Sequence, residues 1–211
     1  KGRARRRAAL EQSFEDYRQL PGVTADGVEI RLEANIETRD DADRAKERGA
    51  AGVGLFRSEF LVASAGQGAL TEEAQYAAYS QVVRSVTPGT VTVRTFDLSE
   101  AQLRPDQASI EGSRARLGLR GIRLSLALDE IFQAQLRALL RAAQHGSLRI
   151  MFPFVSSVEE FRAAREAVTR AAGTLRAGGK EVPSVATGVM IEVPSAAVTA
   201  DLLAAEADFF S

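Results

Sequence analysis

The chain alternates short apolar or β-branched runs with longer segments whose apolar positions recur every three or four residues. The short runs are typical of strands and cover residues 28–36, 53–56, 90–96, 148–155, 187–193 and 208–211. The longer segments have helical periodicity or helix end signals and cover residues 4–20, 40–49, 71–86, 118–144, 157–175 and 196–205. Residues 98–116 are polar and irregular, so we expect a long loop there.

Strand and helix alternate at least five times along the chain. This alternation predicts an α/β fold with a parallel sheet and helices packed outside it. Such a sheet is either doubly wound or closed into a (β/α)₈ barrel. The pattern alone does not decide between the two.

Composition narrows the classes of function. The net charge of −1 gives no field that would favour nucleic acid or a membrane surface. The absence of cysteine excludes disulfides, thiolate zinc sites and a cysteine nucleophile within these residues. No apolar run approaches the roughly 20 residues of a membrane span, and no signal peptide is visible. We expect a cytoplasmic protein that neither binds nucleic acid nor inserts into membranes.

Several predicted strands finish in charged residues. Arg57 and Glu59 follow the second run, Arg94 and Asp97 close the third, and Glu192 lies in the run at residues 187–193. In a parallel barrel these ends face the mouth where active sites form. Arginines bind phosphate and carboxylate through two parallel hydrogen bonds, and carboxylates hold hard cations such as Mg²⁺. The pattern favours a site that binds a small phosphorylated anion together with a metal ion. The alternative is that these charged residues form ion pairs that only stabilise the fold.

Seven segments in order resemble one known family. The chain is similar to the phosphoenolpyruvate (PEP)-utilising enzymes, and most similar to the C-terminal PEP-binding barrel of enzyme I of the sugar phosphotransferase system, a PEP–protein phosphotransferase. The segments that carry the resemblance are residues 52–61, 71–73, 93–97, 117–124, 148–153, 188–195 and 207–211. The resemblance implies a (β/α)₈ TIM barrel of the PEP/pyruvate-binding type that binds PEP and Mg²⁺ at its mouth.

The resemblance also implies roles for particular residues. Arg57, Arg94 and Arg120 are expected to grip the phosphate and carboxylate of PEP. Glu192 is expected to be one of two Mg²⁺ ligands, delivered by a strand that Pro194 helps to end. We expect no catalytic side chain in the chain itself, because the phosphoryl group would pass to a histidine on another domain. That domain would serve a phosphocarrier protein, and the barrel would form a homodimer.

The resemblance divides the chain at residue 22. Residues 1–22 are expected to be a helical linker from an absent N-terminal phosphohistidine domain. Residues 23–211 are expected to form the PEP-binding barrel with its last strands missing, so the fragment alone is expected to be inactive.

The chain departs from the family pattern in four places. The family continues beyond the equivalent of Ser211 with the second metal carboxylate, another arginine and a cysteine. The phosphoacceptor domain is absent, and the single histidine, His145, is expected at a helix end on the surface, away from the mouth. The lysine that follows the equivalent of Asp97 is missing. Arg114 and Ala115 replace an Asn-Pro pair.

Other functions remain open at this point. The barrel could be of the pyruvate phosphate dikinase or PEP synthase type. It could be an Mg²⁺-dependent pyruvate aldolase or lyase, which would also present a metal-binding glutamate. It could be a non-catalytic module for PEP sensing or dimerisation. The sequence does not indicate which carrier protein or pathway would be served.

Overall fold

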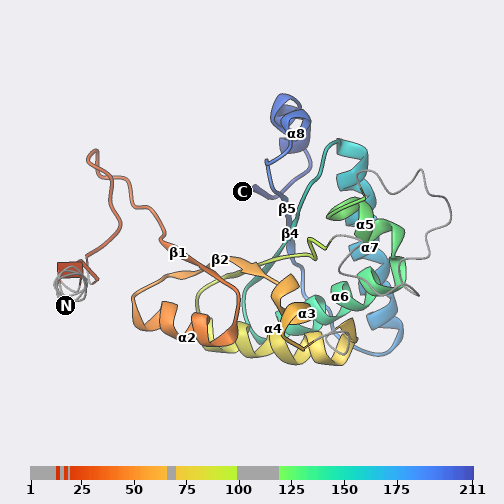
Figure 1. The fold of residues 1–211 in the computed structure, drawn as a ribbon, viewed down its shortest axis with the longest axis horizontal. Helices are drawn as coiled ribbons and strands as arrows, with labels where there is room; N and C mark the ends of the chain where they lie inside the picture. The colour runs from red at the N-terminus through yellow and green to blue at the C-terminus, as the bar shows by residue number, and fades with distance from the viewer. Residues whose placement is uncertain (1–12, 15–16, 19, 66–69, 99–118) are drawn as a thin grey trace.

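A six-stranded parallel sheet forms the centre of the molecule (Figure 1). The computed structural model describes residues 13–14, 17–18, 20–65, 70–98 and 119–211. Each strand pairs in parallel with the next one along the chain, from first to last. The strands are β1 (Glu33–Ile36), β2 (Gly52–Arg57), β3 (Val91–Arg94), β4 (Leu148–Phe152), β5 (Ala186–Val189) and β6 (Phe209–Phe210).

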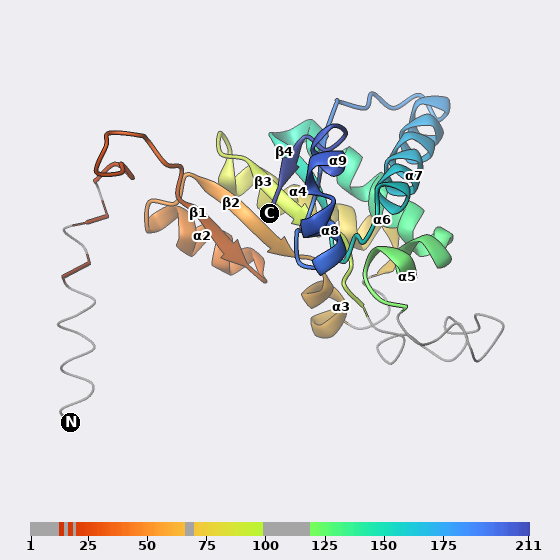
Figure 2. The same cartoon turned by 90° about the horizontal axis from the view of Figure 1, so that it is seen from above.

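Helices connect the strands. They are α2 (Arg39–Glu47), α3 (Glu59–Ala65), α4 (Glu72–Val86), α5 (Ile122–Ala127), α6 (Asp129–Ala142), the 3₁₀ turn η3 (Ala143–His145), α7 (Val158–Ala177), α8 (Pro194–Val198) and α9 (Ala200–Ala204). Helix α6 packs between α4 and α7, and α2 packs against α4. Together these four helices form the outer layer (Figures 1 and 2).

The strand order decides between the two predicted architectures. A doubly wound sheet reverses its strand order at a switch point, whereas these six strands stand in chain order. The sheet is therefore a curled parallel half-barrel, as in part of an α/β barrel. Within the described residues β1 and β6 are its two edges and do not pair with each other.

The core lies between the sheet and the helical layer. Strand residues such as Val93, Ile150 and Phe152 are wholly buried. Phe152 makes edge-on ring contacts with Phe132 on α6 and Phe161 on α7, at centroid distances of 6.4 and 6.1 Å. Edge-on pairs of this kind add about 0.5–1.5 kcal/mol beyond their buried area. These contacts hold α6 and α7 on the sheet.

Three helices begin at side chains that cap their first turns. Thr38 and Asp41 form a capping box at α2, and the side chains of Thr71 and Ser157 accept backbone N–H groups at α4 and α7. Such caps each contribute about 1 kcal/mol. Helix α2 ends just before Gly49, whose φ of 88° suits glycine.

Five of the six predicted strands are shorter in the structure, two of them by four or more residues at one end. The strand expected at residues 28–36 forms only at Glu33–Ile36, because its parallel partner begins at Gly52. The strand expected at residues 187–193 ends at Val189. Pro194 does not end that strand but is the first residue of α8, where its fixed φ and missing N–H suit a helix start.

Other sequence predictions are missed or untested. Helix α3 was not predicted. The expected helix at residues 4–20 and loop at residues 98–116 lie largely outside the described residues. Among the residues that are described, no helix combines the length and apolarity needed to cross a bilayer.

Candidate anion-binding site at the strand ends

The first two predicted arginines lie side by side where their strands end. Arg57 is the last residue of β2 and Arg94 the last residue of β3, and the two are register partners across the ladder. Because partners in a parallel pair face the same side of the sheet, both side chains begin on one face. Arg57 Nη1 donates to Glu37 Oε1 at 3.1 Å, just beyond the end of β1. Three strand ends thus contribute charge to one edge.

Two carboxylates hold Arg94. Its Nη2 is paired with Glu59 Oε1 in the first turn of α3 and lies 3.6 Å from Asp97 Oδ2. All three side chains are nearly buried, with 11, 13 and 6% exposure for Arg94, Glu59 and Asp97. Arg94 Nη1 lies 4.0 Å from Met190 Sδ beyond β5. The guanidinium is therefore fixed between β2, β3 and β5.

Asp97 also binds the third arginine. Arg120 donates from Nε and Nη2 to the two oxygens of Asp97, at 2.9 and 3.2 Å. These hydrogen bonds raise the pKa of Arg120. Its guanidinium also lies 4.4 Å from the ring centroid of Phe154, a cation–π contact. One carboxylate thus joins Arg94 to Arg120, and more than half of the Arg120 side chain stays exposed.

The backbone beside Arg120 is tightly constrained. Gly121 has a φ of 57°, which L side chains rarely adopt. A Cβ at this position would lie 2.9 Å from Phe154 Cβ. Ile122 N donates to Pro153 O at 3.2 Å. Glycine lets the start of α5 approach the end of β4, which places Arg120 over Phe154.

Glu192 reaches the same edge. It lies three residues beyond β5, and its Oε1 accepts the Phe154 backbone N–H at 2.8 Å. The side chain is exposed. Mg²⁺ often takes only one or two protein carboxylates and completes its shell with water and phosphate oxygens. The Glu192 carboxylate faces solvent and is held by one hydrogen bond, so it suits this kind of Mg²⁺ coordination. No cluster of three or more potential ligands among His, Cys, Asp and Glu occurs in the described residues.

Some polar atoms at this edge are buried without a hydrogen-bond partner among the described residues. They are Arg57 Nε, Glu59 Oε2 and Arg94 Nε. An unsatisfied buried polar group costs about 1–3 kcal/mol. A polar ligand or water at the edge could relieve that cost. The arrangement suits a small anion that carries more than one charge.

His145 lies at the opposite end of the sheet, in η3 just before β4. It is half-buried, so the expected surface position is only partly right. Its Nε2 lies 3.0 Å from both Tyr76 Oη and Arg84 Nη2. Partial burial and the Arg84 charge lower the pKa of His145. These contacts are structural and far along the sheet from the arginines.

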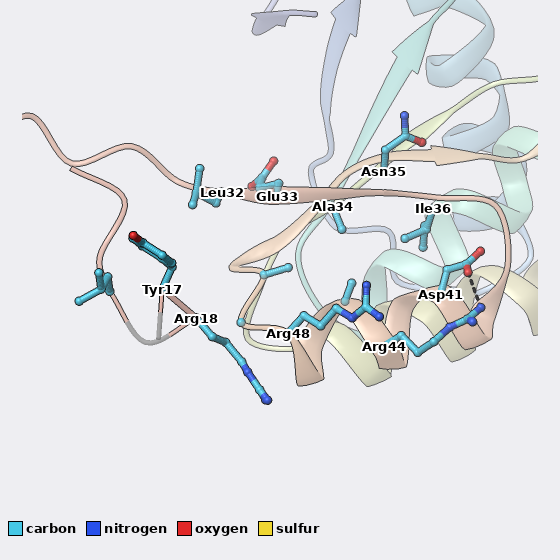
Figure 3. A pocket seen from close by; sticks show the side chains of 14 residues that line it. Tyr17, Arg18, Leu32, Glu33, Ala34, Asn35, Ile36, Asp41, Arg44 and Arg48 are labelled. Carbon is cyan, nitrogen blue, oxygen red and sulfur yellow. Dashed lines mark hydrogen bonds and ion pairs between the residues drawn. The ribbon is translucent and has the colours of Figure 1, made fainter. Parts of the chain in front are cut away.

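A separate groove of about 550 Å³ lies between Tyr17, Arg18 and Leu20 on one side and β1 and α2 on the other (Figure 3). Its lining includes Ala34 and Ile36 on β1 and Arg44 on α2, and Arg44 pairs with Asp41 at 2.6 Å. None of the arginines at the strand ends lines this groove. It therefore does not belong to the candidate site.

The sequence did not point to Ser58, Tyr79 or Gln135, which support the site from beneath. All three are wholly buried. The signal in the sequence that could have indicated Gln135 was a polar residue on an otherwise apolar helix face. Gln135 lies between Phe132, Leu136 and Leu139 on α6, all of which are buried.

The fold and the site define a class of protein. A parallel half-barrel presents three arginines and a metal-competent carboxylate at the carboxyl ends of its strands, where α/β barrels bind ligands. The molecule is therefore a curled parallel α/β half-barrel with a candidate site for a small anion at its strand ends.

Comparison with known proteins identifies the family within this class. The family model described as "PEP-utilising enzyme, PEP-binding domain" matches residues 11–211, and the chain belongs to this family. The chain is 43% identical over 205 residues to the phosphoenolpyruvate-protein phosphotransferase of Listeria innocua, covering 96% of the chain and 36% of that protein. It is 42% identical over 202 residues to the protein of that name from Staphylococcus carnosus, covering 95% and 35%. The chain thus spans about a third of these relatives.

Proposed function

We propose that this chain is the PEP-binding domain of a PEP–protein phosphotransferase. In this reaction the phosphoryl group of PEP passes to a histidine on another domain, and pyruvate is released. Membership of the PEP-binding family and the names of its relatives support this proposal. The same names favour it over a dikinase, a PEP synthase, an aldolase or a non-catalytic module.

The arginines would bind the two anionic groups of PEP. Arg57, Arg94 and Arg120 would contact the phosphate and carboxylate as expected from the sequence. Arg94 and Arg120 are already oriented by Asp97. Preorganised charges stabilise a developing enolate without rearranging during the reaction. Phosphoryl transfer needs little protein chemistry beyond such positioning, so no nucleophile is required in this domain.

Glu192 would hold Mg²⁺ at the same edge. The ion would supply charge neutralisation to the phosphoryl oxygens and to the enolate. The Phe154 N–H orients the Glu192 carboxylate. Arg120 stacks on the same Phe154 ring, so one residue of the β4 loop aligns the metal ligand and a substrate arginine.

The remaining features of the proposal rest on the family. Residues 23–211 would belong to a (β/α)₈ barrel, and residues 1–22 would link it to the phosphohistidine domain. That domain would pass the phosphoryl group to a phosphocarrier protein in sugar transport. The protein would be a cytoplasmic homodimer.

One observation carries the proposal: Asp97 joins Arg94 and Arg120 at the end of the sheet where Glu192 also lies. The test is Arg94→Lys in the native protein, with PEP affinity measured by calorimetry in the presence of Mg²⁺. Lysine keeps the charge but loses the forked geometry. We expect the PEP dissociation constant to rise at least about tenfold, which is ~1.4 kcal/mol.

Arg176→Lys, at an exposed position on the last turn of α7, is the control, and we expect no change in PEP affinity from it. Equal PEP affinity in the Arg94 variant and the unaltered protein would contradict the proposal.

A further inference from the structure

A single buried amide contacts both strand ends that carry the site. Gln135 on α6 is wholly buried. Its Oε1 accepts the Phe96 backbone N–H at 3.1 Å. Its Nε2 donates to Ser58 Oγ at 3.1 Å and to Tyr79 Oη at 2.9 Å. The amide of Gln135 therefore makes three hydrogen bonds, two of them to residues at the ends of β2 and β3.

The residues that Gln135 contacts are sequence neighbours of the candidate ligands. Ser58 lies between Arg57 and Glu59 and donates from Oγ to the Arg94 carbonyl at 2.6 Å. Phe96 immediately precedes Asp97. A shift of the Gln135 amide would thus move the backbone beside the substrate arginines and the carboxylate that joins them.

The direction of every hydrogen bond in this network is fixed by its two ends. The Leu70 carbonyl can only accept, so it takes the N–H of Gln75 Nε2 at 2.9 Å. The Gln75 Oε1 then accepts from Tyr79 Oη at 3.0 Å. Burial raises the pKa of Tyr79, so the phenol keeps its proton. Tyr79 must therefore accept from Gln135.

The other end of the network confirms this polarity. The Phe96 N–H can only donate, and it meets Gln135 Oε1. Only one orientation of the Gln135 amide satisfies both Tyr79 and Phe96. An amide with a single allowed orientation, buried where hydrogen bonds are strong, is suited to setting the relative position of two strand ends.

We propose that Gln135 is a positioning residue for PEP binding, acting through Ser58 and Phe96 on Arg94 and Asp97. This inference rests on the proposed function. Gln135 does not touch the substrate. It holds the arginines' backbone in the geometry that binds the anion, as a supporting shell does in other binding sites.

The same helix offers a matched control. Gln133 is also buried, with 9% exposure. Its Nε2 donates to the Ala167 carbonyl on α7, at 3.1 Å. Gln133 therefore has similar burial and the same chemistry, but this hydrogen bond joins α6 to α7 and not to the strand ends.

The experiment compares Gln135→Met with Gln133→Met in the native protein. Urea unfolding measures stability, calorimetry measures the PEP dissociation constant with Mg²⁺, and steady-state assays give KM and kcat. Both variants are expected to lose stability. We expect the dissociation constant and KM for PEP to rise at least about tenfold in Gln135→Met and less than about twofold in Gln133→Met. Equal effects of the two variants on PEP affinity would overturn the inference.

Two further outcomes of this experiment can be told apart from a failure of the positioning role. If the unaltered protein does not bind PEP, the proposed function fails and this inference fails with it. If Gln135→Met does not fold, Tyr79→Phe removes one hydroxyl and with it one of the three hydrogen bonds that hold the Gln135 amide. Weaker PEP binding by Tyr79→Phe would support the positioning role, and unchanged PEP affinity would refute it.

Discussion

Gly121 and Phe154 touch at the point where Arg120 enters the site. The contact needs both a positive φ and the absence of a Cβ at position 121. Phe154 also has a positive φ, of 56°, and its backbone N–H binds Glu192. Backbone conformations of this kind cost about 1–3 kcal/mol and cluster at functional sites. The strained backbone at Phe154 therefore lies at the same place as the candidate substrate and metal ligands Arg120 and Glu192.

Gly121→Ala tests this contact. The added methyl would force Phe154 and Arg120 apart, so we expect a loss of about 1–3 kcal/mol in the free energy of unfolding and weaker PEP binding. Urea unfolding and calorimetry measure the two effects.

Gly173→Ala is the control for Gly121→Ala. Position 173 lies within α7, and a Cβ added there would meet no atom within 4 Å. It should stabilise the protein by about 0.5–1 kcal/mol, because alanine suits a helix interior better than glycine. A Gly121 variant as stable as the Gly173 variant would contradict this account of the turn.

Glu192→Gln tests the metal assignment. The amide keeps an oxygen that can accept the Phe154 N–H but loses the negative charge that favours Mg²⁺. We expect about tenfold weaker PEP binding in Mg²⁺ and no difference from the unaltered protein in EDTA.

Glu166→Gln, at an exposed position on α7, should behave like the unaltered protein in both buffers. Weakening of PEP binding by Glu192→Gln that is equal with and without Mg²⁺ would rule out a role in metal binding.

The sequence could indicate the charged residues of the site but not their supports. Arg57, Arg94 and Glu192 were found because charges at the ends of apolar runs are conspicuous. Arg120 came from the family resemblance alone. Gln135 was missed because a glutamine within an amphipathic helix has no visible partner until Ser58, Phe96 and Tyr79 are brought to it by the fold.

At the level of elements, ion pairs fasten α4 to α6. Glu72 in the first turn of α4 accepts from Arg137 Nε at 2.6 Å and Arg141 Nη1 at 2.7 Å. Burial alone would raise the pKa of Glu72, but the bonds from the two arginines outweigh it and lower the pKa below 4.5. Arg141 also lies 4.0 Å from the ring centroid of Tyr76. The pair of helices that carries Tyr79 and Gln135 is thus held together.

The lowered pKa gives a prediction about pH. A carboxyl with a lowered pKa in the folded state contributes stability above its unfolded pKa, and this is lost as the pH falls through the folded pKa. We expect Glu72→Gln to cost about 1 kcal/mol at neutral pH. The unfolding free energies of variant and unaltered protein should converge as the pH falls below 4.5.

Glu73→Gln is the control, because Glu73 is 76% exposed and, within the described residues, its ion pair is with Arg141. A smaller loss of stability is expected from it. A Glu72 variant whose deficit stays constant from neutral to acid pH would contradict the ion-pair account.

Element boundaries were predictable where local chemistry sets them. The caps at Thr38, Thr71 and Ser157 are readable because the capping side chain and its partner lie within three residues. Strand lengths were not readable. Residues 28–32 have a strand pattern, but β2 offers a partner only from Glu33 onward. The length of a strand depends on its neighbour, which the pattern does not contain.

At the level of the whole molecule, strand order brings the site together. Six parallel strands in chain order put every carboxyl end at one edge of the sheet. Residues as distant in sequence as Arg57 and Glu192 therefore reach the same mouth. The alternation of elements predicted the parallel sheet, but both a doubly wound sheet and a barrel share that alternation. Only the pairing of the strands separates them.

The central claim is that this edge binds PEP together with Mg²⁺. The most direct measurement is calorimetric titration of the native protein with PEP, with Mg²⁺ and with EDTA, beside sulfate as a simple anion. The account predicts PEP binding that needs Mg²⁺ and is at least about tenfold tighter than sulfate binding. PEP binding no tighter than sulfate binding, or unaffected by EDTA, would contradict it.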